Sequence, residues 1–426
     1  MKKTFSMTGR ERIRTVLAHR EADRVAMDFG STPVTGMHAT CVAALRKHYG
    51  LPEHPVFVHE PYQMLAEVEP DLREALGVDT VGVFPPCNIF GFRAERWKEW
   101  RTPWGQQVMV PGDFITTPAP DGGWHIYPAG DRSAPASGHL PAKGCFFDTI
   151  VRQEPIDDDN LKVEDNLEEF TPISESDLAY FRTSTSAAAT TGEAVVATIG
   201  GTAFGDIALV PAPFLKKPKG IRDVEEWYIS ISERPQYVRA IFEKQCEIAL
   251  SNLAKVAAVV SDNIDVVYVC GTDFGTQLSQ FCSVKTFREL YQPFYRAVND
   301  WIHQHTHWKS FKHTCGAVRP LIPELIEAGF DILNPVQCSA AGMEAAGLKK
   351  DFGDQITFWG GCVDTQKTLP FGTPEEVRRE VLSRCEIFSR GGGFVFNSIH
   401  NLQARTPAAN LVAMFEAVRE FNGRRS

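Results

Sequence analysis

The sequence of 426 residues has no apolar run long enough to span a bilayer, and its first 25 residues carry charges throughout in place of an apolar core. We therefore expect neither a membrane segment nor a secretory leader. The sequence also lacks any block of lysine and arginine, and its formal net charge is −9. This acidic balance argues against nucleic acid and anionic membrane surfaces as partners.

The cysteines do not form the paired motifs of a secreted disulfide scaffold. Ten of them are scattered along the chain, which favours free thiols in a reducing compartment. We therefore expect a cytoplasmic protein. No G-x-G-x-x-G follows any apolar run, and this absence argues against an open dinucleotide-binding sheet.

Eight short apolar runs alternate with amphipathic helical stretches, in a chain of ordinary globular composition (43% hydrophobic, 23% charged). The runs are continuously apolar, as is typical of parallel strands buried on both faces. A count of eight predicts an α/β protein with a (β/α)8 TIM barrel, formed by residues 1–426 as a single domain. A doubly wound open sheet is the alternative. The predicted strands are 24–30, 79–86, 194–201, 265–275, 310–316, 330–337, 356–363 and 392–400.

Two features stand out outside the predicted strands. Thr8 with Glu11, and Thr373 with Glu376, have the spacing of capping boxes that begin helices. Residues 91–170 are rich in Trp, Pro and Gly and contain a "DGG" turn signal between alternating segments. We expect β-hairpins here, inserted after the second strand and lying over the mouth of the barrel.

Polar side chains gather where the predicted strands end, which is where a TIM barrel carries its chemistry. His313 and Cys315 are two residues apart, so on a strand both would face the same side, and together they suit zinc. Spacing alone leaves a metal role and simple packing equally open. The other candidates at strand ends are Asp28, Cys270, Asp273, Asn334, Gln337 and His400.

Three segments resemble a known superfamily: "HTCGAVRPLIPELIEAGFDILNPVQ", "FWGGCVDTQKTLPFGTPEEVRREV" and "NSIHNLQARTPAANLVAMFEAV". They are similar to the uroporphyrinogen decarboxylase superfamily, and most similar to its corrinoid-dependent methyltransferase branch. The resemblance covers roughly residues 190–426 and implies a (β/α)8 barrel. In that branch an H-x-C pair and a later cysteine bind zinc. His313 and Cys315 match the first two ligands, and position 400 has the histidine of the decarboxylases.

The resemblance implies a zinc-dependent methyltransferase that moves a methyl group between a small methylated substrate, or a thiol, and a corrinoid protein. A separate carrier is expected because the chain has no D-x-H-x-x-G, the motif that supplies histidine to cobalamin in dedicated carriers. Zinc would be held by His313, Cys315 and His400. We assign catalytic roles to Asp273 and Asp28, and substrate contacts to the remaining candidates, Asn334, Gln337 and Cys270.

Two alternatives remain open. One is a metal-free decarboxylase in which His400 and Asp28 contact an acidic substrate, although the region after Arg24 offers no arginine until Arg46 to hold carboxylates. The other is a non-catalytic barrel that binds a corrinoid or another ligand. A homodimer is the default expectation for the assembly.

Overall fold

The computed structural model describes residues 6–424 and contains an eight-stranded parallel sheet. Its spatial order is β1-β17-β16-β15-β14-β13-β12-β5. The two edge strands approach each other where the Asp79 N–H donates to the Met27 carbonyl at 2.8 Å, which nearly closes the barrel. The predicted (β/α)8 barrel is confirmed. Its strands are β1 (Ala26–Met27), β5 (Thr80–Val83), β12 (Ala194–Thr198), β13 (Val266–Cys270), β14 (Lys309–His313), β15 (Ile332–Asn334), β16 (Thr357–Trp359) and β17 (Phe394–Phe396).

The interior of the barrel is filled by side chains from most of its strands. Phe311 and Trp359 are the largest of these side chains, and their rings meet edge to face with centroids 5.4 Å apart. Helix α1 (Gly9–Leu17) closes the amino-terminal end of the barrel by packing Ile13 and Val16 into the same cluster. The amino-terminal end of the barrel is therefore closed. A ligand can reach the barrel only at the carboxyl ends of the strands, where TIM barrels carry their active sites.

Three aspartates at the amino-terminal end of the barrel tie neighbouring strands together. Asp79, Asp265 and Asp331 each stand one residue before a strand. Their carboxylates accept backbone N–H groups of the adjacent strand, from Met27 at 2.9 Å, Val195 at 2.9 Å and Ser310 at 2.8 Å. Each carboxylate thus fixes strand register and satisfies a buried backbone donor.

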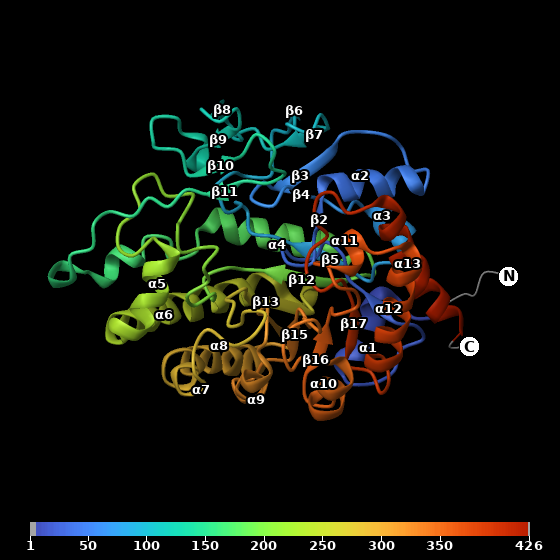
Figure 1. Cartoon of the computed structure of the whole chain (residues 1–426). Coiled ribbons are helices and arrows are strands. Elements are labelled where there is room, and N and C mark those ends of the chain that lie inside the picture. Colours follow the sequence, from blue (N-terminus) through green and yellow to red (C-terminus); the bar gives the residue numbers. More distant parts are fainter. Residues whose placement is uncertain (1–5, 425–426) are drawn as a thin grey trace.

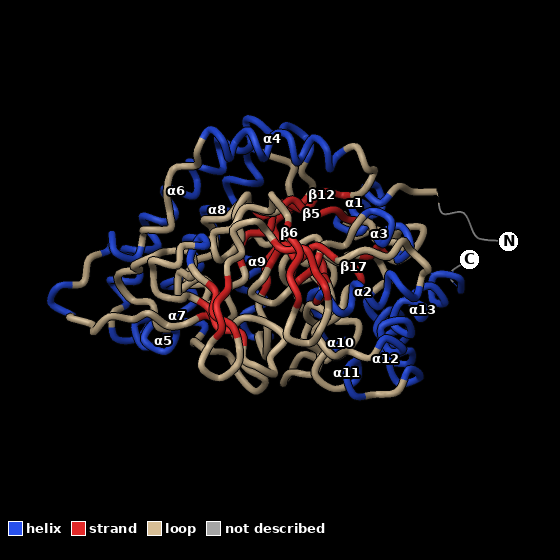
Figure 2. Tube along the Cα trace, turned by 90° about the horizontal axis from the view of Figure 1, so that it is seen from above, coloured by secondary structure: helices blue, strands red, loops and turns tan. Residues whose placement is uncertain are grey.

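Helices surround the barrel, as Figures 1 and 2 show. The expected capping boxes are confirmed at α1, by Thr8 and Glu11, and at α12, by Thr373 and Glu376. No helix within residues 6–424 is both long and apolar enough to cross a membrane. The principal helices are α3 (Pro70–Leu76), α4 (Glu175–Ala189), α5 (Val224–Glu233), α6 (Pro235–Val260), α8 (Gln292–His305), α9 (Ile322–Glu327), α10 (Ala345–Phe352), α12 (Pro374–Phe388) and α13 (Ala408–Arg424).

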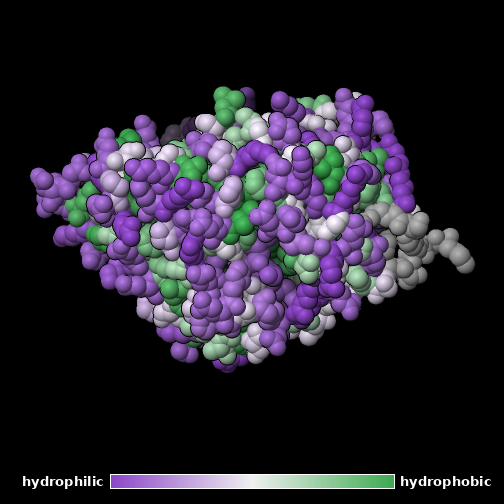
Figure 3. Space-filling model, turned by 90° about the horizontal axis from the view of Figure 1, so that it is seen from below, coloured by the Kyte–Doolittle hydropathy of each residue, from purple (hydrophilic) through white to green (hydrophobic). Residues whose placement is uncertain are grey.

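Two small sheets lie on one side of the barrel, at the top of Figure 1. One is antiparallel, with the order β11-β10-β9-β8 (Asp148–Thr149, Gly138–Leu140, Trp124–Ile126, Thr116–Pro118). The other has the order β2-β4-β3-β7-β6 (Met37–His38, Leu65–Ala66, Val56–Glu60, Gln107–Val110, Lys98–Arg101). Residues 37–66 therefore share a sheet with residues 98–110, although they precede the second barrel strand. Figure 3 shows the opposite face, which is largely hydrophilic with scattered apolar residues.

Candidate metal centre

His313, Cys315 and His400 meet at the carboxyl ends of the strands. His313 ends β14, Cys315 follows two residues later, and His400 lies four residues beyond β17. One ligand atom from each lies within 4.8 Å of the others, and His313 Nε2 is 3.4 Å from Cys315 Sγ. Tetrahedral zinc with ordinary Zn–N and Zn–S bonds places two ligand atoms about 3.6 Å apart. The His313–Cys315 separation therefore matches a zinc ligand pair, and a ring nitrogen of His400 lies within 4.8 Å of both.

The side chain of Asn334 fixes the orientation of the His313 ring. Its amide nitrogen donates to the Trp359 carbonyl at 2.7 Å, so its oxygen faces His313 Nδ1 at 2.6 Å. The imidazole then carries its proton on Nδ1, donates it to Asn334 and leaves the Nε2 lone pair free. Metal-binding histidines are held in this way by a second hydrogen bond.

His400 has the same arrangement with its neighbour in the sequence. Asn401 donates its amide N–H to Gln63 Oε1 at 2.7 Å, and its oxygen lies 2.7 Å from His400 Nδ1. His400 therefore also keeps Nε2 free. The two rings meet edge to face, with centroids 5.5 Å apart. Two imidazoles of the same tautomer thus converge beside one thiol.

Burial sets the protonation of all three groups. It lowers the pKa of His313 to about 4 and lowers the pKa of His400, so both rings are neutral near pH 7. Burial and the nearby charge of Asp273 raise the pKa of the Cys315 thiol well above its usual value. Without a metal the thiol keeps its proton, and a cation bound here would displace it.

The segment that follows β14 is held by polar side chains from two neighbouring loops. Asp273 Oδ1 accepts the Cys315 N–H at 2.6 Å and lies 3.8 Å from His313 Nε2. Gln337 Oε1 accepts the Gly316 N–H at 2.8 Å. A β-carbon on Gly316, whose φ is +90°, would lie 2.3 Å from the backbone carbon of Gly275. The turn after Cys315 therefore requires glycine.

Two of the predicted site residues have their contacts elsewhere. The Asp28 carboxylate accepts from Thr80 Oγ1 at 2.7 Å and Trp359 Nε1 at 2.9 Å, which ties β1 to β5 and β16. Cys270 is completely buried at the end of β13, and burial raises the pKa of its thiol. The structure thus brings together six of the eight predicted residues and leaves these two apart. Among the six, Asn334 and Gln337 contact His313 and the Cys315–Gly316 segment.

One carboxyl group and one phenol that the sequence did not reveal, Asp206 and Tyr268, lie beside this centre. Asp206 lies on the loop after β12, and its Oδ2 and the Tyr268 hydroxyl both approach Gly271. A β-carbon there would lie 2.4 Å from Tyr268 Oη and 2.8 Å from Asp206 Oδ2, so glycine provides the space in which they meet. Burial, together with the charge of Asp273, raises the pKa of Asp206 to about 6.

A buried lysine, also missed, supports the same strand ends. Lys312 has no exposed surface, and its ammonium donates to the Thr272 carbonyl at 2.6 Å and to the His313 carbonyl. It also lies 5.1 Å from the ring centroid of Phe274. The ammonium therefore joins the ends of β13 and β14 and places a positive charge beside the acidic groups.

The fold and the site together define a TIM barrel with a candidate zinc centre at the carboxyl ends of its strands. The family model described as Uroporphyrinogen decarboxylase (URO-D) matches residues 142–421. The chain belongs to the uroporphyrinogen decarboxylase (URO-D) family.

Two individual proteins illustrate this relationship. A uroporphyrinogen decarboxylase from Pseudoalteromonas translucida (strain TAC 125) is 30% identical over 95 residues, which are 20% of this chain and 26% of that protein. The matched segment thus spans about a quarter of that relative. A methyltransferase from Methanosarcina mazei has a similar structure with a TM-score of 0.54 at 14% identity, covering 98% of this chain and 99% of that one. At that identity the likeness shows a shared fold.

Proposed function

We propose that this protein is a zinc-dependent methyltransferase that moves a methyl group between a small methylated substrate, or a thiol, and a corrinoid carried by a separate protein. The observation that carries the proposal is the convergence of two neutral imidazoles and one thiol within 4.8 Å. Both imidazoles leave a ring nitrogen free for a metal. Membership of the URO-D family and the fold shared with a methyltransferase add support.

The proposed donor set is His313, Cys315 and His400, with a fourth position left for substrate. Zinc held there would act as a Lewis acid on the atom that loses the methyl group, or would bind a thiolate acceptor. A second imidazole in place of a thiolate makes the site one charge unit more positive. This difference favours polarising a methylated oxygen or nitrogen.

The surrounding residues have supporting roles in this proposal. Asn334 and Asn401 orient the imidazoles, and Asp273 and Gln337 hold the Cys315–Gly316 segment. Asp273 Oδ1 also lies 3.8 Å from His313 Nε2, and its catalytic role stays a prediction. Direct substrate contacts by Asn334, Gln337 and Cys270, and a catalytic role for Asp28, stay predictions.

The test of this proposal measures metal and methyl transfer together. The purified protein is incubated with free cob(I)alamin, standing in for the carrier's corrinoid, and with separate methoxylated aromatic, methylated amine and methylated thiol substrates. We expect zinc-dependent formation of methylcobalamin with one class, and its loss in Cys315→Ser. A zinc-loaded protein that methylates cobalamin with none of the three classes would contradict the proposal.

The metal-free decarboxylase is the second candidate, and it is favoured by the family and by histidine at position 400. The two arginines named for this region form ion pairs instead: Arg24 binds Asp79 at 2.8 Å, and Arg46 binds Asp71 at 2.8 Å. Release of carbon dioxide from uroporphyrinogen by Cys315→Ser would favour this function. Tight corrinoid binding without methyl exchange would favour the non-catalytic barrel. The cytoplasm is the proposed location, because all ten cysteines are free, and a homodimer stays a prediction.

A further inference from the structure

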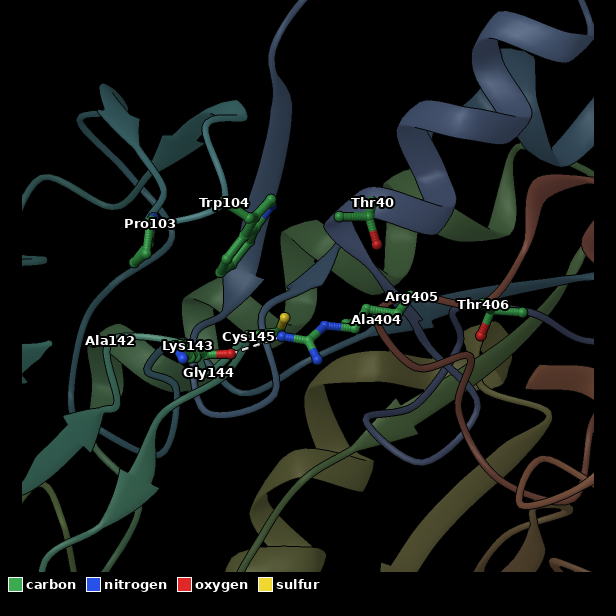
Figure 4. Close-up of a pocket in the computed structure, with 10 residues that line it drawn as sticks. All are labelled: Thr40, Pro103, Trp104, Ala142, Lys143, Gly144, Cys145, Ala404, Arg405 and Thr406. Atoms are coloured by element: carbon green, nitrogen blue, oxygen red, sulfur yellow. Dashed lines mark hydrogen bonds between the residues drawn. The ribbon is translucent and has the colours of Figure 1, made fainter. Parts of the chain in front are cut away.

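A cavity that includes none of the candidate metal ligands lies between the small sheets and the loop that follows β17. Its volume is about 480 Å³, which is within the usual range for small-molecule sites. Figure 4 shows the ten residues that line it. They are Thr40, Pro103, Trp104, Ala142, Lys143, Gly144, Cys145, Ala404, Arg405 and Thr406.

The charged side chains that line this cavity are all positive. Lys143 and Arg405 are its charged lining residues, and no carboxylate lines it. Arg405 Nη2 donates to the Lys143 carbonyl at 2.7 Å, and Figure 4 shows its side chain reaching toward the 142–145 segment. Within residues 6–424 neither cation forms an ion pair with a carboxylate. In a chain of net charge −9, two unpaired cations on one cavity point to an anionic ligand.

An aromatic wall stands beside these cations. Trp104 donates its indole N–H to Gln106 Oε1 at 3.0 Å, and Gln106 donates to the Ala39 carbonyl at 3.0 Å. These two bonds fix the indole against the start of α2 (Ala39–His48). Pro103, Ala142 and Ala404 supply further apolar surface. A flat ring can therefore stack on an indole whose orientation is already set.

A buried histidine fixes the other walls of the cavity. His38 donates its Nε2 proton to the Cys145 carbonyl at 2.9 Å, and its Nδ1 accepts from the Thr40 hydroxyl at 2.8 Å. Burial lowers the pKa of His38 to about 4, so the ring stays neutral and keeps both bonds near physiological pH. Residues 40 and 145, from distant parts of the chain, are thus held in place before any ligand arrives.

We propose that this cavity binds a small molecule that carries a phosphate monoester on a flat heteroaromatic ring, the size of a nucleoside monophosphate. A phosphate monoester carries close to two negative charges at pH 7, which matches the two cations. An arginine and a lysine form charge-assisted hydrogen bonds with its oxygens. The ring lies against Trp104. This site is distinct from the proposed zinc centre and does not depend on the proposed methyl transfer.

Isothermal titration calorimetry of the full-length protein with adenosine monophosphate, adenosine and inorganic phosphate tests this proposal. We expect adenosine monophosphate to bind most tightly, and added salt to weaken it. Arg405→Gln and Lys143→Gln should each reduce its affinity about tenfold, through loss of one charge-assisted hydrogen bond. Trp104→Leu should weaken adenosine monophosphate and leave inorganic phosphate unchanged.

Arg132→Gln, which removes an exposed positive charge elsewhere, is the matched control and should bind like the parent protein. Thermal unfolding of each variant checks its folding, and the two cation variants lie on separate segments, so one of them reports if the other misfolds. Absence of adenosine monophosphate binding at millimolar concentration would overturn the proposal. Equal affinity for adenosine, or an unchanged affinity in both cation variants, would overturn it as well.

Discussion

Asn334 Oδ1 lies 2.6 Å from His313 Nδ1, and the other end of the same amide is anchored to the Trp359 carbonyl. This anchored amide decides which nitrogen of His313 carries the proton. The free nitrogen is the one that faces Cys315, 3.4 Å away. The side-chain amide of Asn334, held by its hydrogen bond from β15 to β16, therefore orients a ligand on β14.

Replacing Asn334 tests this relationship. Asn334→Leu removes the acceptor for the Nδ1 proton, and we expect zinc affinity to fall about 10- to 100-fold, as for other partners of metal-bound histidines. Asn334→Asp is the matched control, because it keeps an oxygen that accepts from His313. Competition with a chelator of known affinity measures both. Equal zinc affinity in Asn334→Leu and the parent protein would show that the amide does not prepare the ligand.

The raised pKa of the Cys315 thiol predicts a pH dependence of metal binding. Zinc must displace the thiol proton, whereas both imidazoles are already neutral near pH 7 because burial lowers their pKa values. Apparent zinc affinity should therefore rise about tenfold per pH unit between pH 6 and 8, the slope expected when one proton is released. The chelator competition repeated across this range measures the slope. A flat profile would mean that no thiol proton is displaced.

The turn at Gly316 offers a test of stability. Gly316→Ala places a β-carbon against the backbone of Gly275 in addition to forcing a left-handed conformation. Gly391→Ala is the matched control, because Gly391 also has a positive φ of 70° but has nothing within 4 Å of the added carbon. We expect Gly391→Ala to cost about 1–2 kcal/mol of unfolding free energy, and Gly316→Ala clearly more. Urea denaturation compares them. Similar losses in the two variants would contradict the close approach of the two loops.

The carboxyl of Glu60 predicts a pH dependence of folding. Burial at the end of β3 raises the pKa of Glu60 to about 7 from its usual value of 4.5, despite hydrogen bonds from the N–H groups of Tyr62 and Gln63. The folded state thus holds the proton more tightly, so the stabilisation is complete below pH 4.5 and is lost as the pH rises through about 7. Between pH 5 and 8 this group should cost about 2 kcal/mol.

Glu60→Gln removes this titration. The difference in unfolding free energy between Glu60→Gln and the parent protein, from urea denaturation at several pH values, should increase in favour of the variant as the pH rises. If the difference is the same at pH 5 and pH 8, Glu60 has the same pKa in the folded and unfolded states.

Most of the barrel could be predicted because its strands are buried on both faces and therefore form continuous apolar runs. The run 265–275 extends beyond β13, which ends at Cys270, because the loop after the strand remains apolar at Phe274. The two-residue strands β2 and β4 are too short to show a period, and β3 pairs with β7, which is distant from it in sequence. An aspartate directly before a strand, as at Asp79, is a signal that could have marked strand starts.

The metal site was only partly readable from the sequence. The spacing of His313 and Cys315 predicted a shared side, and the structure places their ligand atoms in contact. The zinc-binding role of His400 depended on family resemblance, because His400 lies in a loop beyond β17, where strand spacing does not apply. Asn401 and Asp206 were missed, since their roles arise from contacts across the barrel that spacing along the chain does not encode.

Zinc content of the purified protein and two variants tests the central claim most directly. Elemental analysis should find about one zinc per chain in the parent protein, as for other three-ligand sites. Cys315→Ser should lose the metal, and His400→Cys, which substitutes one zinc ligand for another, should retain it. If the parent protein contains no zinc after growth and dialysis in zinc-supplemented buffer, or if Cys315→Ser holds as much as the parent, these three side chains do not form a metal centre.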